Sequence, residues 1–224
     1  MSDTIPVTFS LAFFEYRANF ADPVFELWSA PDRALQKSLY KALLPWGITL
    51  DNVQLPAQPK NVNEWQLTFN LLRFRTSVII GTGGLIISVN NPDWSQANLI
   101  AAIAAAALAA VKEAITTSIA AQNASLAMHL TPMGSTAKQI TAPFLNVKDA
   151  ATSRLGEPKY LGFSIYGERA VWVVDASAVF PDSLFLRLVR SHDGDTGIAE
   201  ILKALEEDER GILSMLGLHE NVSS

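Results

Sequence analysis

The chain is almost uncharged over a long central segment, and this constrains the fold more than any other feature of the sequence. Between Leu85 and Val147 the charged side chains are only Asp93, Lys112, Glu113 and Lys138. A helix or strand with one face in water normally carries more charge than this. The segment is therefore expected to lie at the centre of the fold, covered on both faces, or to form part of a subunit interface.

An alanine-rich helix is the most regular element of this segment. Asn91-Pro92-Asp93 is typical of a helix N-terminus, and the helical pattern continues to about Gln122. At 100° per residue one face carries the larger side chains: Ile100, Ile103, Ala107, Leu108, Val111, Ile115 and Ile119. The opposite face consists of the candidate interface residues Ala102, Ala105, Ala106 and Ala109. Such a face lets a second backbone approach closely, although alanine is also the best helix former.

The apolar part of this helix is too short for a membrane span. Its uncharged run, Leu99 to Val111, has 13 residues, whereas a transmembrane helix needs about 20. The N-terminus, Met1 to Pro6, has neither the positive charge nor the apolar core of a signal peptide. We therefore expect a cytoplasmic protein with a buried central helix and no membrane partner.

Two elements are expected before residue 50. Residues 5 to 17 alternate as in a half-buried strand, and the side chains expected to face the core are Val7, Phe9, Leu11 and Phe13. Ser29-Ala30-Pro31-Asp32 has the composition of a helix start, and the helix is expected to end at Leu44, before Pro45.

A β-hairpin is expected next. The β-rich run from Trp65 to Ile80 is joined to Leu85–Val89 by Gly81-Thr82-Gly83-Gly84. A phosphate-binding loop also uses glycines, but the rest of that motif is missing here. After the alanine-rich helix, Leu126–Leu130 alternates as a strand. Up to residue 132 the expected order is thus strand, helix, hairpin, helix, strand, as in a ferredoxin-like unit.

The rest of the chain is expected to repeat part of this order in shortened form, with three strands and one helix. Residues 133–158 form an irregular connection, and strands are expected at Tyr160–Tyr166, Ala170–Val174 and Leu184–Val189, before a C-terminal helix capped by Thr196. We therefore predict an α+β fold with antiparallel sheets and two long helices, and a helix-grip fold is the alternative. Its parts are 1–132, 133–158 and 159–224, which together form one compact unit.

Composition excludes several functions. The chain has no cysteine, which excludes disulfides, thiol nucleophiles and cysteine-bound metals. Its formal charge of −5 argues against a nucleic-acid partner. We expect no cofactor and no metal.

One loop combines the residue types that catalysis uses. His192, Asp193 and Asp195 lie between a strand and a helix, and they are the candidate catalytic residues. Their spacing partly resembles a calcium loop, but Gly197, Ile198 and Ala204 stand where that loop needs other residues. The simpler interpretation is a loop that caps the following helix.

Other polar candidates are less specific. Arg73 and Arg75 alternate with apolar residues, so they are expected on one strand face, beside Arg17, where they would bind an anion or lie in solvent. His129 is expected to be a surface or structural histidine on the strand face opposite Leu126. The acidic run Glu206–Glu209 is interpreted as the wet face of the last helix, or as a docking site for a basic partner.

These features leave two functions open. The first is a non-catalytic cytoplasmic protein that binds a partner, either a second copy in a homodimer or another protein. The low charge, the alanine face and the lack of a catalytic motif favour it. The second is a small-ligand carrier or an enzyme with a pocket between the sheet and the long helix, supported by 11 Phe, 5 Trp and 4 Tyr residues.

Overall fold

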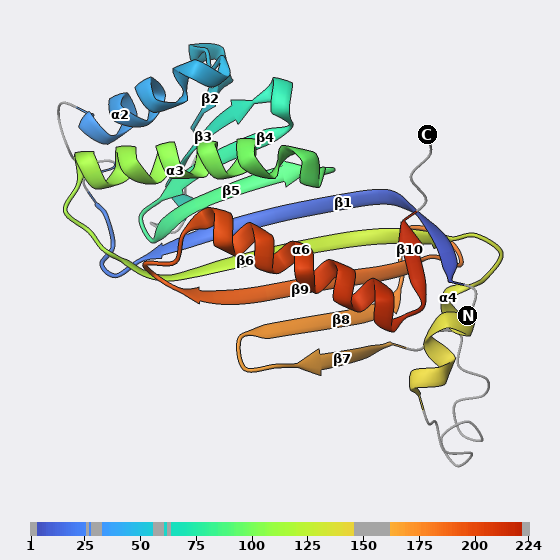
Figure 1. The fold of residues 1–224 in the computed structure, drawn as a ribbon. Helices are drawn as coiled ribbons and strands as arrows, with labels where there is room; N and C mark the ends of the chain where they lie inside the picture. Colours follow the sequence, from blue (N-terminus) through green and yellow to red (C-terminus); the bar gives the residue numbers. More distant parts are fainter. Residues whose placement is uncertain are drawn as a thin grey trace. The chain divides into compact units, whose positions relative to one another are not determined.

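A computed structural model describes residues 4–25, 27, 33–55, 61, 64–145 and 162–220. The chain is a mixed α+β protein with a large antiparallel sheet, as expected (Figure 1). Its strands are β1 (Ile5–Phe20), β2 (Val53–Gln54), β3 (Gln66–Leu71), β4 (Thr76–Gly81), β5 (Gly84–Asn90), β6 (Ile119–Pro132), β7 (Phe163–Tyr166), β8 (Ala170–Ala176), β9 (Leu184–Asp193) and β10 (Leu218–Glu220). Its α-helices are α2 (Ala34–Leu43), α3 (Ala97–Ala114), α4 (Ala137–Thr141) and α6 (Ile198–Met215).

The strand order is β2-β3-β4-β5-β1-β6-β9-β8-β7, and β10 pairs in parallel with β1. The ferredoxin-like order is not confirmed, because the run expected as one strand folds as β3 and β4 around a short 3₁₀ turn, Leu72–Phe74. The expected hairpin is confirmed: β4 and β5 are antiparallel, with Gly81 opposite Gly84. Residues 29–32, the expected helix start, lie outside the described residues, as do residues 146–158 of the expected connection.

Two compact units make up the chain, and each contains discontinuous segments. Unit 1 consists of residues 1–12, 125–190 and 205–224, and unit 2 of residues 13–124 and 191–204. In unit 2, α2 and α3 lie side by side over one face of β3, β4 and β5 (Figure 1). Buried side chains of the helices and of the strands form the unit's core, and they include Phe14, Tyr16, Leu39, Phe69, Ile80, Ile87 and Ile103.

Helix α3 begins close to its expected N-terminus but ends early. Asp93 accepts a hydrogen bond from the backbone N–H of Ser95 at 2.8 Å, which stabilises the turn that leads into the helix. Hydrogen bonding by the Ser95 side chain, and then by this N–H, lowers the pKa of Asp93. The helix ends at Ala114, and Ile115 is already extended (φ −143°, ψ 151°). The expectation of a helix to Gln122 is therefore wrong. The stretch Ile115–Ile119 contains four β-branched residues, which favour extended backbone.

The buried side of β1 changes along its length. Val7 is buried, but from Ala12 onward the even-numbered residues are buried and Phe13 is 43% exposed. The expectation that Phe13 faces the core is therefore wrong. Both sets of positions carry apolar side chains in this strand, so alternation alone could not locate the change.

In unit 1, one face of β9 is buried along Leu184, Leu186 and Leu188, and Val174 of β8 is also at 0% exposure. Arg190 on the same face as these leucines donates two hydrogen bonds to Asp208 of α6, at 2.7 and 2.8 Å. Asp208 and Glu209 are only 5% and 7% exposed. The interpretation of Glu206–Glu209 as a wet helix face is therefore wrong for half of the run, because Asp208 pairs with an arginine from a neighbouring strand.

Candidate interaction surface

The outer face of α3 is open in the described structure. Ala102, Ala105 and Ala109 are exposed, and Ala106 is half-buried. The inner face of the helix is buried and consists of Ile100, Ile103, Ala104, Ala107, Ala110 and Val111. The described part of a single chain therefore leaves most of the alanine face uncovered.

Exposed residues of α3 follow the spacing of a helix-packing seam. Asn98, Ala102, Ala105, Ala109 and Lys112 are separated by four, three, four and three residues, and all five are exposed. This spacing keeps side chains on one stripe along a helix that packs against another helix. The stripe is apolar in its centre and polar only at its two ends. We call these five residues the α3 seam.

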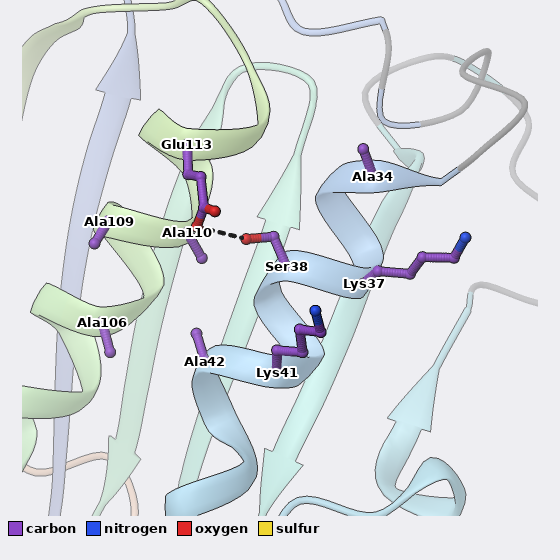
Figure 2. Close-up of a pocket in the computed structure, with 9 residues that line it drawn as sticks. All are labelled: Ala34, Lys37, Ser38, Lys41, Ala42, Ala106, Ala109, Ala110 and Glu113. Carbon is purple, nitrogen blue, oxygen red and sulfur yellow. Dashed lines mark hydrogen bonds between the residues drawn. The ribbon is translucent and has the colours of Figure 1, made fainter.

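A shallow hollow of about 540 Å³ lies beside the seam, between α2 and α3. Figure 2 shows that Ser38 and Ala42 of α2 point towards α3, and that Ala110 and Glu113 of α3 point towards α2. Ser38 Oγ donates a long hydrogen bond, 3.5 Å, to Glu113 Oε2. The hollow is lined largely by small side chains, since five of its lining residues are alanines: Ala34, Ala42, Ala106, Ala109 and Ala110.

The rim of this hollow carries positive charge. Lys37 and Lys41 of α2 are both exposed and stand one helical turn apart. Lys37 extends away from α3 in Figure 2. Glu113 of α3 lines the hollow as well, so the surface combines an apolar seam with a charged edge of both signs. An apolar centre with a polar rim is the arrangement found in protein interfaces.

The expectation that this helix is too short for a membrane span is not confirmed. By length and composition, the helical stretch Trp94–Ala114 could cross a membrane, with a mean hydropathy of 1.6 over its most apolar window. A core helix of a soluble protein passes the same test. Here 33% of that window is buried, and the buried side chains lie in the core of unit 2.

The candidate catalytic loop is held in place by its backbone. Asp193 ends β9, and a buried amide, Gln122 of β6, donates from Nε2 to the carbonyl oxygens of Asp193 (2.9 Å) and Thr196 (2.8 Å). The Tyr16 hydroxyl donates to Gln122 Oε1. Tyr16 and Gln122 are 0% and 1% exposed. Sequence reasoning missed Gln122, because its partners come from distant segments.

The three candidate catalytic side chains do not converge on one enclosed site in the described structure. Asp193 and Asp195 are exposed, and His192 is half-buried. Asp195 lines a separate surface hollow of about 470 Å³ with Lys112, Thr117 and Ser118. Helix α6 begins at Ile198, and Gly197 provides the first carbonyl acceptor, to the N–H of Glu200 and Ile201. A catalytic role for His192, Asp193 and Asp195 stays a prediction.

Stability should fall at high pH because Tyr16 is buried. Burial raises the pKa of the Tyr16 hydroxyl above its ordinary value of 10.0. Above that ordinary pKa the unfolded chain loses this proton while the folded chain keeps it, so the free energy of unfolding should decrease by about 1.4 kcal/mol per pH unit from this group. Urea titrations between pH 9 and 11.5 measure this decrease. In Tyr16→Phe this contribution is absent, so the free energy of unfolding should fall less steeply with pH, by about 1.4 kcal/mol per pH unit. An unchanged pH dependence would contradict this role of Tyr16.

The three candidate arginines do not share a strand face. Arg17 lies on β1 and forms an exposed ion pair with Glu15 at 3.4 Å. Arg73 lies in the turn before β4 with its guanidinium 5.5 Å from the Phe74 ring centroid, and Arg75 has a left-handed backbone (φ 51°). The expectation of a strand for Arg73 and Arg75 is therefore wrong.

Arg17 and Arg75 are also separated along the sheet. Arg17 pairs with Ile86 of β5, whereas the carbonyl of Arg75 accepts a hydrogen bond from Asn90 of the same strand. Four residues of β-strand correspond to about 13 Å. Anion binding by these arginines stays a prediction.

His129 is buried in unit 1 and takes part in a network that the sequence did not reveal. Its Nδ1 lies 2.8 Å from Ser177 Oγ, and that oxygen accepts from the N–H groups of Val179 (3.1 Å) and Phe180 (2.9 Å). The Ser177 hydroxyl thus joins the imidazole to two backbone N–H groups. The rings of Phe180 and Phe185 pack on the imidazole. This arrangement closes the turn before β9, which is a structural role.

Within the described residues, no group of three or more His, Asp or Glu side chains is placed to hold a metal ion. A comparison with models of known protein families finds no match, and a comparison with curated proteins finds none either. The function proposed for the chain is therefore inferred from its own geometry.

Proposed function

We propose that the protein is a non-catalytic, cytoplasmic interaction protein that forms a homodimer through the α3 seam. The observation that carries the proposal is the exposure of Ala102, Ala105 and Ala109 at helix-packing spacing. Small side chains allow two helix axes to approach to about 8 Å, at which distance both backbones contribute van der Waals contacts. The low charge of the whole central segment is consistent with a surface that is covered in the assembled protein.

The ends of the seam favour antiparallel pairing. A two-fold axis near Ala105 places Ala102 opposite Ala109 of the second copy, and Asn98 opposite its Lys112. The Lys112 ammonium can then donate to the side-chain carbonyl of Asn98. Parallel pairing would instead put two Lys112 side chains next to each other, which is unfavourable.

The alternative function, a ligand carrier or enzyme with a pocket between sheet and helix, has less support. The hollow of about 540 Å³ lies between α2 and α3 at the surface. Below α3 the core of unit 2 contains large buried side chains such as Tyr16, Phe69 and Ile103. A filled core beside an open apolar seam favours the interaction function.

A single charge on the seam should break the contact between the two α3 helices. In Ala105→Lys, two ammonium groups meet at the two-fold axis, so the molar mass from light scattering at micromolar concentration should fall to about half of the wild-type value. Lysine is nearly as good a helix former as alanine, so α3 should remain folded.

Ala199→Lys is the matched control, since Ala199 is an exposed alanine of α6. This variant should keep the wild-type molar mass. Equal masses for wild type and Ala105→Lys, with unchanged circular dichroism, would contradict the proposal.

A further inference from the structure

A second exposed feature lies at the β7 end of the strand order. Within the described residues β7 pairs only with β8. Its sequence, Phe163-Ser164-Ile165-Tyr166, contains no charge and no proline, and Ile165 and Tyr166 are 40% and 77% exposed. An edge strand presents unpaired N–H and C=O groups, and proteins usually protect such edges with charge, proline or very short strands.

The other end of the strand order has such protection. There β2 consists of only two residues, Val53 and Gln54. Strand β7 is twice as long and consists of strand-forming residues with an exposed aromatic ring. The two ends therefore differ in the features that discourage pairing with another strand.

We propose that β7 is a self-association surface, at which β7 of two copies pairs antiparallel around a two-fold axis at Ser164. This surface is separate from the α3 seam and does not depend on it. Because each copy can use both surfaces, the full assembly is then larger than a dimer.

The register of this pairing is set by the alternation of β7. Antiparallel partners must have the same orientation relative to the sheet faces, so a two-fold axis at Ser164 places Phe163 opposite Ile165 of the second copy. Aromatic side chains paired with β-branched ones stabilise antiparallel strands. Both such pairs form at once, since the axis repeats each contact. The centre holds two serines and no charge.

Gly162 adds a second self-complementary contact. A Cβ at this position would lie 2.7 Å from Asp175 Oδ1 and 2.9 Å from the carbonyl oxygen of Val174, so Gly162 must lack a side chain. In the proposed register Tyr166 of the second copy lies opposite Gly162. An aromatic ring that covers a glycine across two strands compensates for the missing side chain. In this register the exposed Tyr166 ring covers Gly162 of the second copy.

The experiment uses Ala105→Lys as background, so that the α3 seam cannot contribute. This variant should still associate, giving about twice the chain mass of 24.3 kDa by light scattering. Adding Ser164→Lys places two like charges opposite each other and should weaken association at least about fivefold. Adding Ser164→Glu should do the same, and an equimolar mixture of the two double variants should restore the dimer.

Controls separate the two surfaces. Val179→Lys in the same background changes a residue that is 61% exposed but lies outside β7, and it should leave the dimer intact. A monomeric Ala105→Lys, or a mixture of the charged variants that stays monomeric, would overturn the β7 proposal and leave the α3 proposal standing.

A measurement that does not depend on Ala105 uses the absence of cysteine from the chain. Ser164→Cys in the otherwise unchanged protein should form a disulfide-linked dimer on mild oxidation, because directly opposite strand residues have Cβ atoms about 4.5–5.5 Å apart. Val179→Cys should not form it. Equal cross-linking of the two variants would overturn the proposal.

Discussion

Replacing Gly194 with alanine is expected to destabilise the chain by at least about 3 kcal/mol, or to prevent folding, because backbone occupies the space that a side chain needs. A Cβ on Gly194 would overlap the carbonyl oxygen of Ile119 and lie 2.7 Å from its carbonyl carbon. Neither atom can rotate away, since Ile119 begins β6. Urea denaturation followed by circular dichroism measures the loss, and the soluble yield measures it if the variant does not fold.

Gly197→Ala is the control for this prediction. Gly197 lies three residues away in the same loop, and a Cβ at this position would have no neighbouring atom within 4 Å. Gly197→Ala should therefore lower the free energy of unfolding by less than about 1 kcal/mol, mainly because alanine is a poorer helix N-cap than glycine. If Gly194→Ala and Gly197→Ala are equally stable, the loop does not make this tight contact with β6.

Replacing Gln122 with leucine is expected to have the second-largest effect, about 2–4 kcal/mol. The buried amide joins the Tyr16 hydroxyl to the carbonyls of Asp193 and Thr196. Leucine fills a similar volume but removes this shared partner from all three groups. The Asp193 carbonyl keeps the N–H of Thr196 at 3.3 Å, so the loss falls mainly on the buried Tyr16 hydroxyl and the partly buried Thr196 carbonyl. Each buried group left unsatisfied costs about 1–3 kcal/mol. Urea denaturation of the variant and the wild type measures the difference.

A double-mutant cycle tests whether the network acts as a unit. Tyr16→Phe combined with Gln122→Leu removes both ends of the Tyr16–Gln122 hydrogen bond, so the double variant should be less destabilised than the sum of the single variants by about 1 kcal/mol. Free energies of unfolding that add without this difference would show that the Tyr16–Gln122 bond contributes nothing.

Local patterns predicted strands better than they predicted ends of elements. The patterns located β8, most of β9 and the second half of β6 (Leu126–Leu130), and glycines located the β4–β5 turn. The turn between β3 and β4 was missed because Leu72-Arg73-Phe74-Arg75 contains no glycine, proline or asparagine, and its left-handed residue is an arginine. The C-terminal end of α3 was missed because Ile115 and Ile119 continued the helical spacing by coincidence.

Polar residues were harder to interpret, because their roles depend on distant partners. The loop at His192 was found by its composition, but what holds it is Gln122, which is 71 residues from Asp193 in sequence. Asp208 belongs to an acidic run and was expected in water, whereas Arg190 on a neighbouring strand pairs with it. The α3 seam was found because an alanine face depends only on local helical spacing.

The most direct test of the α3 seam is a site-specific disulfide. Because the chain has no cysteine, Ala105→Cys introduces a single thiol, placed at the proposed two-fold axis. Mild oxidation at micromolar concentration should convert most of this variant to a covalent dimer, whereas Ala120→Cys, an exposed alanine of β6, should remain largely uncross-linked. Failure of Ala105→Cys to cross-link beyond the Ala120→Cys control would contradict the assembly of this protein through α3.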